Sequence, residues 1–297
     1  MNRLFITIII LFTYIITYSQ PNKIKFGKVS KDELKMQKYQ NDTSADAVIL
    51  SDIGELYFQY NNYRNPKGFQ YYFQRHLRIK IFNKNALNYG NHNIYLFHSG
   101  NNKEKLKSFN AYSFNIENGK ISKDKIKKKD LLTEQFNKNK DVVKCIMPNV
   151  KEGTILDIYY EIESDYLYYL REWQFQYNIP VAWSEIKVTI PEFFDYKHFF
   201  KGYYDLTINN YNFYIDQVFK IDYVDKSANS SYGQRNSWEL NSHSKIMHFA
   251  AENVPSFKNE PYNPSNENYI FKLFFELAQT KFPRSPVESY AKSWKSV

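Results

Sequence analysis

Hydrophobic and polar positions alternate most regularly between Pro148 and Pro191. Apolar residues occupy every second position in three runs, at 156–163, 173–179 and 186–190. A strict period of two is typical of β-strands that bury one face. This stretch therefore predicts three strands, which are separated by a turn-like segment and a proline.

The same period recurs on both sides of this stretch. Further strands are expected at 48–50, 56–60, 76–81, 94–97, 112–116, 143–147, 213–223, 238–249 and 269–277. The last of these also fits one face of a helix, but its many aromatic residues favour a strand. Together the runs predict a mostly β fold, a large antiparallel β-sandwich.

Two turns are expected from local chemistry. Asp52-Ile53-Gly54 should reverse the chain between the first two runs, because Asp and Gly are common in turns. Asn118-Gly119 should close a two-residue hairpin, because both residue types tolerate the positive φ of a type I′ turn.

Helix signals stand near both ends of the predicted sandwich. Ser30 and Glu33 form a capping box, which predicts a short helix ending near Asn41. Ser285 and Glu288, with a proline between them, predict the start of a second helix. Because few residues follow, we hypothesise that the chain is a fragment or a truncated relative of a longer protein.

The first nineteen residues have the pattern of a targeting signal. Arg3 provides a positive charge, Leu4 to Ile16 is apolar, and Thr17 to Ser19 resembles a signal peptidase site. The apolar run is short for a membrane span, although an uncleaved anchor helix is the alternative. We expect cleavage after Ser19 and export to the periplasm or the cell surface.

Composition agrees with an exported β protein. Aromatic residues are 19% of the chain, and large flat side chains suit pleated sheets. Cys145 is the single cysteine, so no intrachain disulfide can form. The net charge of +9 allows anionic partners, but the basic run 123–129 is interpreted as a solvated loop or strand edge. We expect no nucleic-acid partner.

Several segments resemble one family. They are residues 42–50, 76–87, 146–162, 173–196 and 252–262. Together they resemble domain of unknown function 3857, the β-rich domain at the N-terminus of exported transglutaminase-like proteins of Bacteroidota. The resemblance covers nearly all of residues 25–297. It implies a β-sandwich that precedes a Cys-His-Asp core absent from this chain, and it assigns no catalytic residue to this region.

Candidate catalytic and metal-binding residues have simpler explanations. Cys145 shares its parity with Val143 and Met147, so it is predicted to be a buried core thiol rather than a nucleophile. The pairs His92/His98 and His243/His248 lack the spacing of a zinc motif. Glu161 and Glu163 share a strand face and are interpreted as its solvent side. We therefore predict no catalytic residues, no cofactor and no metal.

A tyrosine cluster is the remaining candidate for binding. Tyr166, Tyr168 and Tyr169 lie between two predicted strands. Exposed tyrosines make good contacts with sugars or proteins. The alternative is that these rings cover one end of the core.

The predicted organisation has four parts. They are a signal peptide (1–19), a lead-in with a short helix (20–44), a β-sandwich (45–282) and a truncated helix (283–297). The leading functional hypothesis is a non-catalytic accessory domain that serves a downstream transglutaminase-like domain. A carbohydrate- or cell-envelope-binding module that contacts a glycan or an envelope protein is the alternative, and a hydrolase in its own right is a third.

Overall fold

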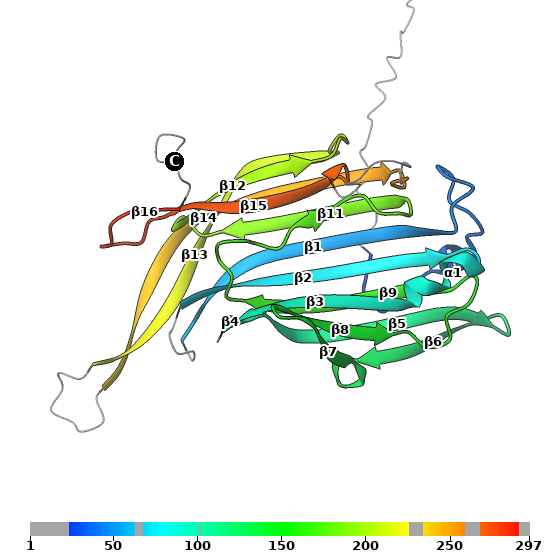
Figure 1. Cartoon of the computed structure of the whole chain (residues 1–297), viewed down its shortest axis with the longest axis horizontal. Helices are drawn as coiled ribbons and strands as arrows, with labels where there is room; N and C mark the ends of the chain where they lie inside the picture. The colour runs from blue at the N-terminus through cyan, green and yellow to red at the C-terminus, as the bar shows by residue number, and fades with distance from the viewer. Residues whose placement is uncertain (1–23, 63–67, 101, 226–233, 259–267, 291–297) are drawn as a thin grey trace, which may run out of the picture.

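A computed structural model describes residues 24–62, 68–100, 102–225, 234–258 and 268–290. The expected signal peptide lies outside the described residues. Among the described residues, no helix has both the length and the apolar character needed to cross a membrane. The fold is mostly β, as predicted, and consists of one eight-stranded sheet and two four-stranded sheets (Figure 1).

The eight-stranded sheet runs through the middle of the molecule. Its strands, in spatial order, are β13 (Ile208–Asp225), β14 (Gln234–Val254), β11 (Val181–Ile190), β1 (Ala47–Asn61), β2 (Gly68–Ile81), β9 (Ile155–Ser164), β5 (Lys105–Glu117) and β6 (Lys120–Lys127). All neighbours are antiparallel except β1 and β11, which are parallel. The basic run 123–129 lies on edge strand β6 and the turn after it, as the sequence analysis expected.

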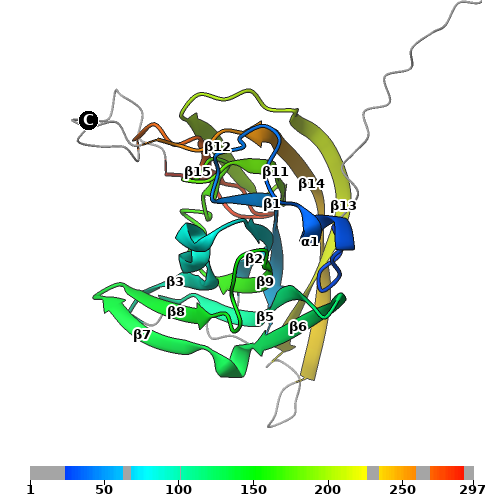
Figure 2. The same cartoon turned by 90° about the vertical axis from the view of Figure 1, so that its right-hand side faces the viewer.

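Two smaller sheets lie on one side of the large sheet (Figure 2). The first contains β10 (Trp173–Gln174), β15 (Lys272–Thr280), β12 (Phe194–Lys201) and β16 (Glu288–Ser289). The second contains β4 (Asn102–Lys103), β3 (Asn91–Ser99), β8 (Lys140–Ile146) and β7 (Leu132–Asn137). The described helices are short: α1 (Lys31–Lys35), η1 (Lys84–Gly90) and η2 (Lys128–Asp130).

The main core lies between the large sheet and the two small ones. Inward-facing residues of the large sheet, such as Leu77 and Ile158, pack with Phe275 of the first small sheet and Val143 of the second. Trp173 is 2% exposed and is among the largest buried side chains. Burial of this apolar area is the main term that stabilises the sandwich.

The N-terminal segment packs on the opposite face of the large sheet. Ser30 accepts a hydrogen bond from the Glu33 backbone, and the Glu33 carboxylate accepts one from Ser30, so the predicted capping box is present. Leu34 packs with Phe114 and Ile155. The helix ends at Lys35 rather than near Asn41, because Met36 already has extended backbone angles.

The prediction of a turn at Asp52-Ile53-Gly54 is wrong. β1 continues through all three residues and pairs with β2 along its whole length. Asp52 has a buried ion-pair partner in Arg75, so its side chain serves the core rather than a turn. By contrast, Asn118 and Gly119 have φ of 50° and 75° and close the predicted β5–β6 hairpin.

The C-terminal helix expected from residue 283 does not form over its described part. Residues 288 and 289 form β16, and the Tyr290 amide donates to the Ala278 carbonyl. Because the edge of β15 offers backbone partners, an extended path satisfies this segment without helical hydrogen bonds. Residues 291–297 lie outside the described residues, and the domain limits at 44 and 282 stay predictions.

The predicted run 173–179 is a strand only at β10. Phe175 and Ile179 are nevertheless buried as the alternation requires. The residues expected as strand at 269–277 form β15, so the strand was the correct choice over the helix.

Candidate functional site

The tyrosine segment, residues 165–172, links β9 to β10 along the edge of β15. Its turn is held by a hydrogen bond from the Tyr169 amide to the Tyr166 carbonyl. Leu170 is 5% exposed and anchors the segment in the core. Tyr169 also forms an isolated bridge with Glu276 of β15. These contacts fix the directions in which the three tyrosines point.

The three tyrosines do not form one cluster. Tyr166 and Tyr169 line a cavity of about 600 Å³, whereas Tyr168 lines a different groove of about 480 Å³. The Tyr168 ring lies edge-on to Tyr290, with ring centroids 5.1 Å apart. Tyr168 lies within the turn, whereas Tyr169 follows it at the bridge with Glu276, so the two rings point into different parts of the surface. The three residues therefore do not share one cavity, and their role in partner binding stays a prediction.

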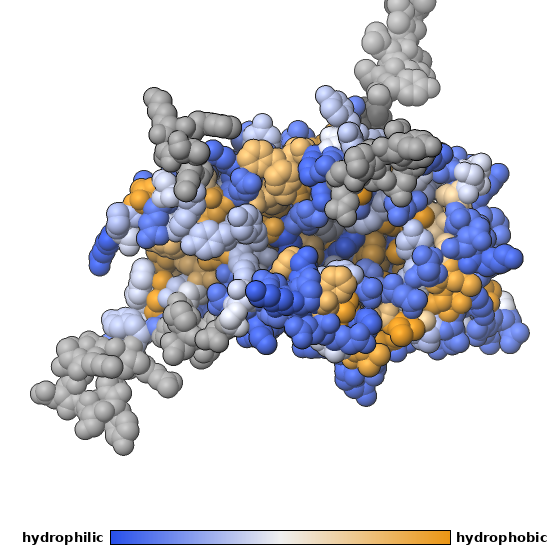
Figure 3. All heavy atoms as spheres, in the orientation of Figure 1, coloured by the Kyte–Doolittle hydropathy of each residue, from blue (hydrophilic) through white to orange (hydrophobic). Residues whose placement is uncertain are grey.

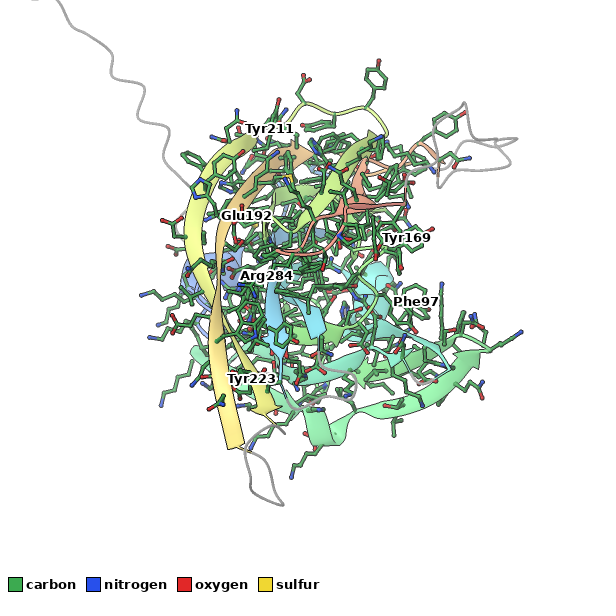
Figure 4. The ribbon with its side chains drawn as sticks, turned by 90° about the vertical axis from the view of Figure 1, so that its left-hand side faces the viewer. Phe97, Tyr169, Glu192, Tyr211, Tyr223 and Arg284 are labelled. Atoms are coloured by element: carbon green, nitrogen blue, oxygen red, sulfur yellow. The ribbon has the colours of Figure 1, made fainter. Side chains whose placement is uncertain are left out.

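The cavity of about 600 Å³, here called the aromatic cleft, lies between the two small sheets. Tyr95 and Phe97 of β3 form one wall, and Phe274 of β15 and Tyr169 form the other. The surface is hollowed between the layer of β12 and β15 and the layer of β3 and β8 (Figure 3). Figure 4 shows Tyr169 above Phe97 on the same side of the molecule.

An ion pair joins the two walls at the floor of the cleft. Arg171 Nη2 lies 2.5 Å from Glu104 Oε2, and the Glu104 carboxylate is almost fully buried. Burial would lower the pKa of Arg171, but the adjacent Glu104 carboxylate raises it above its ordinary value. Arg171 therefore stays charged at neutral pH.

The same two side chains occupy the part of the β3 edge that β4 leaves uncovered. Glu104 Oε2 accepts a hydrogen bond of 2.8 Å from the Phe97 amide. Arg171 Nη2 donates to the Tyr95 carbonyl at 2.6 Å. A strand edge normally offers such groups to an added strand, and here side chains have already satisfied them.

Tyr71 completes the floor from the large sheet. Its hydroxyl donates a hydrogen bond of 3.2 Å to Glu104 Oε1. Burial, and then the negative charge of Glu104, raise the pKa of Tyr71 above its ordinary value. The hydroxyl thus remains a protonated donor, and the cleft floor is held by a fixed set of hydrogen bonds.

Polar groups surround the mouth of the cleft. Glu172 and Glu276 are exposed on one side, and Asn139 and Lys140 lie on the other. The Lys140 ammonium lies 4.7 Å from the centre of the Phe97 ring. The mouth therefore combines exposed aromatic rings with carboxylate, amide and ammonium groups.

Cys145 is a core thiol, as predicted. It is 2% exposed, and its Sγ contacts the sulfur of Met147 at 3.5 Å. Burial raises the pKa of the Cys145 thiol to about 12. A thiol that stays protonated and enclosed is not an activated nucleophile.

The histidines lie apart from one another. His243 faces Asp216 at 2.9 Å, His248 faces Glu185 at 2.8 Å, and His98 faces Asp141 at 3.4 Å. Burial and the charge of Arg75 lower the pKa of His92 to about 3. Within the described ranges, no group of three or more His, Cys, Asp or Glu side chains could hold a metal ion.

Glu161 and Glu163 do not form a solvent-exposed face, which corrects the sequence interpretation. Glu163 is 4% exposed and lies 2.7 Å from the Lys107 ammonium. Glu161 accepts a hydrogen bond of 2.6 Å from Gln74. Side chains from neighbouring strands bond both carboxylates, from β1 and β2 at Glu161 and from β2 and β5 at Glu163.

Sequence reasoning missed the residues that build the cleft floor. Glu104 and Arg171 are 67 positions apart, and neither lies in a recognisable motif. A second missed pair, Arg75 and Asp52, lies under Tyr177, with Arg75 Nη2 2.6 Å from Asp52 Oδ2. No local pattern signals such long-range pairs.

A protein-family model matches this chain. A family described as "Domain of Unknown Function with solved-structure structure (DUF3857)" matches residues 69–220, just over half of the chain. The matched range begins in β2 and ends in β13, so it includes Glu104 and the tyrosine segment. Comparison with curated proteins gave no match.

A solved structure is also similar. It is the crystal structure of a "putative protease" from Parabacteroides distasonis, with 15% sequence identity and a TM-score of 0.50. The similarity covers 77% of this chain and 40% of that chain. At this identity the match shows a shared fold, and the chain spans well under half of that protein's length.

Proposed function

Because the chain belongs to the DUF3857 family, we propose that it is a non-catalytic β-sandwich domain of an exported protein. In this proposal it positions, or recruits a partner for, a transglutaminase-like or protease-like core. The aromatic cleft is the surface through which it selects that partner. The partner is the core itself, a cell-envelope protein or a glycan.

One observation carries the non-catalytic assignment. Cys145, the single cysteine of the chain, is enclosed in the core with a pKa of about 12. A cysteine hydrolase needs a thiolate in reach of its substrate. The catalytic work of a cysteine-type hydrolase would therefore belong to another domain.

The similarity to the Parabacteroides protein supports an accessory role. That protein is described as a "putative protease", and the similarity to this chain covers 40% of it. The proposed arrangement places this sandwich before a transglutaminase-like core of the kind found in Bacteroidota. The targeting pattern of residues 1–19 supports a periplasmic or cell-surface location.

The gene provides the first test. We expect the reading frame at the source locus to continue beyond Val297 into a domain that carries Cys, His and Asp. A stop codon at this position in the native gene would contradict the accessory role.

A hydrolase assay provides the second test. Wild type and Cys145→Ala are compared on casein and on a glycan substrate, and we expect neither to show activity. Activity that disappears in Cys145→Ala would instead identify this chain as an enzyme.

A further inference from the structure

We propose that the aromatic cleft binds a neutral sugar ring of an oligosaccharide, which stacks against Tyr169. The inference rests on the proposed function, since it names the class of partner that this domain recruits. It is carried by three features of the cleft: its exposed rings, its polar groups and its closed strand edge.

Exposed aromatic rings gather at the mouth of the cleft from separate elements. Tyr169 is 72% exposed, Phe97 42% and Tyr95 39%. Leaving apolar ring faces in water has a free-energy cost that a bound ligand can remove. The C–H face of a pyranose ring is flat and weakly apolar, so it covers an aromatic face while its hydroxyls remain in the plane.

Planar polar groups stand beside these rings. The Glu276 and Glu172 carboxylates can accept hydroxyl donors, with one Glu172 oxygen already bonded to Lys272 at 3.1 Å. The Asn139 amide can both donate and accept.

The cleft disfavours a peptide that would add a strand. Such binding needs free backbone groups at a sheet edge. At β3, the Phe97 amide and the Tyr95 carbonyl are already bonded to Glu104 and Arg171. A ligand recognised through ring faces and hydroxyls does not require these groups.

The described residues of the cleft have no net positive charge to attract an anionic ligand. Glu172 is paired with Lys272 at 3.1 Å, and the positive charge of Arg171 is neutralised by Glu104. The carboxylate of Glu276 balances the ammonium of Lys140. The exposed lysines of β6 lie on a different element, at the far edge of the large sheet. The volume of about 600 Å³ is within the usual range of small-molecule sites. These features favour a neutral sugar over an acidic one.

The experiment measures binding of the full chain to a panel of immobilised neutral and acidic oligosaccharides. We expect at least one neutral oligosaccharide to bind, and Tyr169→Ala to weaken that binding about tenfold, which corresponds to one lost ring contact. Tyr169→Phe keeps the ring and should retain most of the affinity.

Tyr168→Ala is the matched control. Tyr168 is the adjacent residue and is 55% exposed, but it lines the other groove. We expect this variant to bind like the wild type. Thermal unfolding of each variant, measured in parallel, confirms that the fold is retained.

Two results would overturn the proposal. One is a panel in which no neutral oligosaccharide binds, or in which only acidic ones bind in a salt-sensitive way. The other is an equal loss of binding in Tyr168→Ala and Tyr169→Ala. If the reading frame nevertheless continues into a catalytic core, only the sugar assignment fails and the accessory function stands.

Discussion

Gly54 lies directly under the indole ring of Trp173. A Cβ built on Gly54 would be 2.5 Å from Cζ3 of Trp173, far inside van der Waals contact. The indole is fixed from its other side, because its Nε1 donates to Ser184 Oγ at 3.0 Å. β1 thus needs a residue without a side chain at this position. The space above Gly54 is filled by Trp173, which directly follows the tyrosine segment and enters the core there.

We predict that Gly54→Ala lowers the free energy of unfolding by about 1–3 kcal/mol, the usual cost of overpacking a core. The added methyl group would push Trp173 away from Ser184. Urea unfolding followed by tryptophan fluorescence measures the change.

Gly68→Ala is the control for this prediction. Gly68 also lies in a strand, but no atom stands within 4 Å of a Cβ built there. We expect this change to have little effect on stability. Equal destabilisation by the two substitutions would contradict the role assigned to the contact with Trp173.

Gly54 also shows why part of the fold was predictable and part was not. Alternation is a local property, so the strands at 156–163 and 186–190 could be read from the sequence. The Asp52-Ile53-Gly54 sequence has local turn chemistry, but the glycine serves a contact with a residue more than a hundred positions away. Tertiary contacts override local preference at such positions.

The candidate site also has a part that the sequence predicts and a part that it does not. The tyrosine segment was recognisable because its aromatic residues lie between two predicted strands. The separation of Tyr168 from Tyr169 depends on how the segment lies against β15, and the floor pair Glu104–Arg171 joins distant parts of the chain. Neither has a sequence signal, since each exists only after the sheets have packed.

Asp157 is the centre of a buried ion-pair network under the N-terminal segment. It is fully buried and accepts hydrogen bonds from His76, Arg78 and the Gly27 amide. Burial alone would raise the pKa of Asp157, but the hydrogen bonds from His76 and Arg78 and the charge of Arg78 outweigh it and lower the pKa below 3.8. The charged carboxylate therefore stabilises the fold.

We predict that Asp157→Asn lowers the free energy of unfolding by about 3 kcal/mol at neutral pH, the lower end for breaking a buried ion pair, because Arg78 keeps only its second ion pair, with Glu33 at 2.9 Å. The contribution of Asp157 is present above its unfolded pKa and is lost as the pH falls through the lower folded value. The wild type should therefore lose more stability on acidification than the variant does.

Glu134→Gln is the control for Asp157. Glu134 is 55% exposed and pairs with Lys144 on the surface, where an ion pair contributes about 1 kcal/mol or less. Equal pH dependence of the wild type and Asp157→Asn in urea titrations would show that the carboxylate is not ionised in the fold.

Cys145 should be unreactive until the protein unfolds. At about pH 8 a thiol with a pKa of about 12 is almost entirely protonated, and its burial excludes the reagent. We predict no reaction of the folded chain with Ellman's reagent and reaction of one thiol per chain in denaturant. Rapid labelling of the folded chain would contradict the core placement and would restore Cys145 as a candidate nucleophile.

Lys80 should make the fold more stable in mild alkali. Its ammonium donates to the carbonyls of Leu34 and Gly153, and burial lowers the pKa of Lys80 from 10.5 to about 8. Between these two values the unfolded chain keeps a proton that the folded chain releases, so this group raises the free energy of unfolding by about 3 kcal/mol as the pH rises.

Lys80→Met cannot titrate, and tyrosine ionisation affects both proteins alike. We therefore predict that the stability of the wild type minus that of Lys80→Met, measured by urea unfolding, grows between about pH 7 and about pH 10. A difference that stays constant or shrinks would show that Lys80 keeps its proton in the fold.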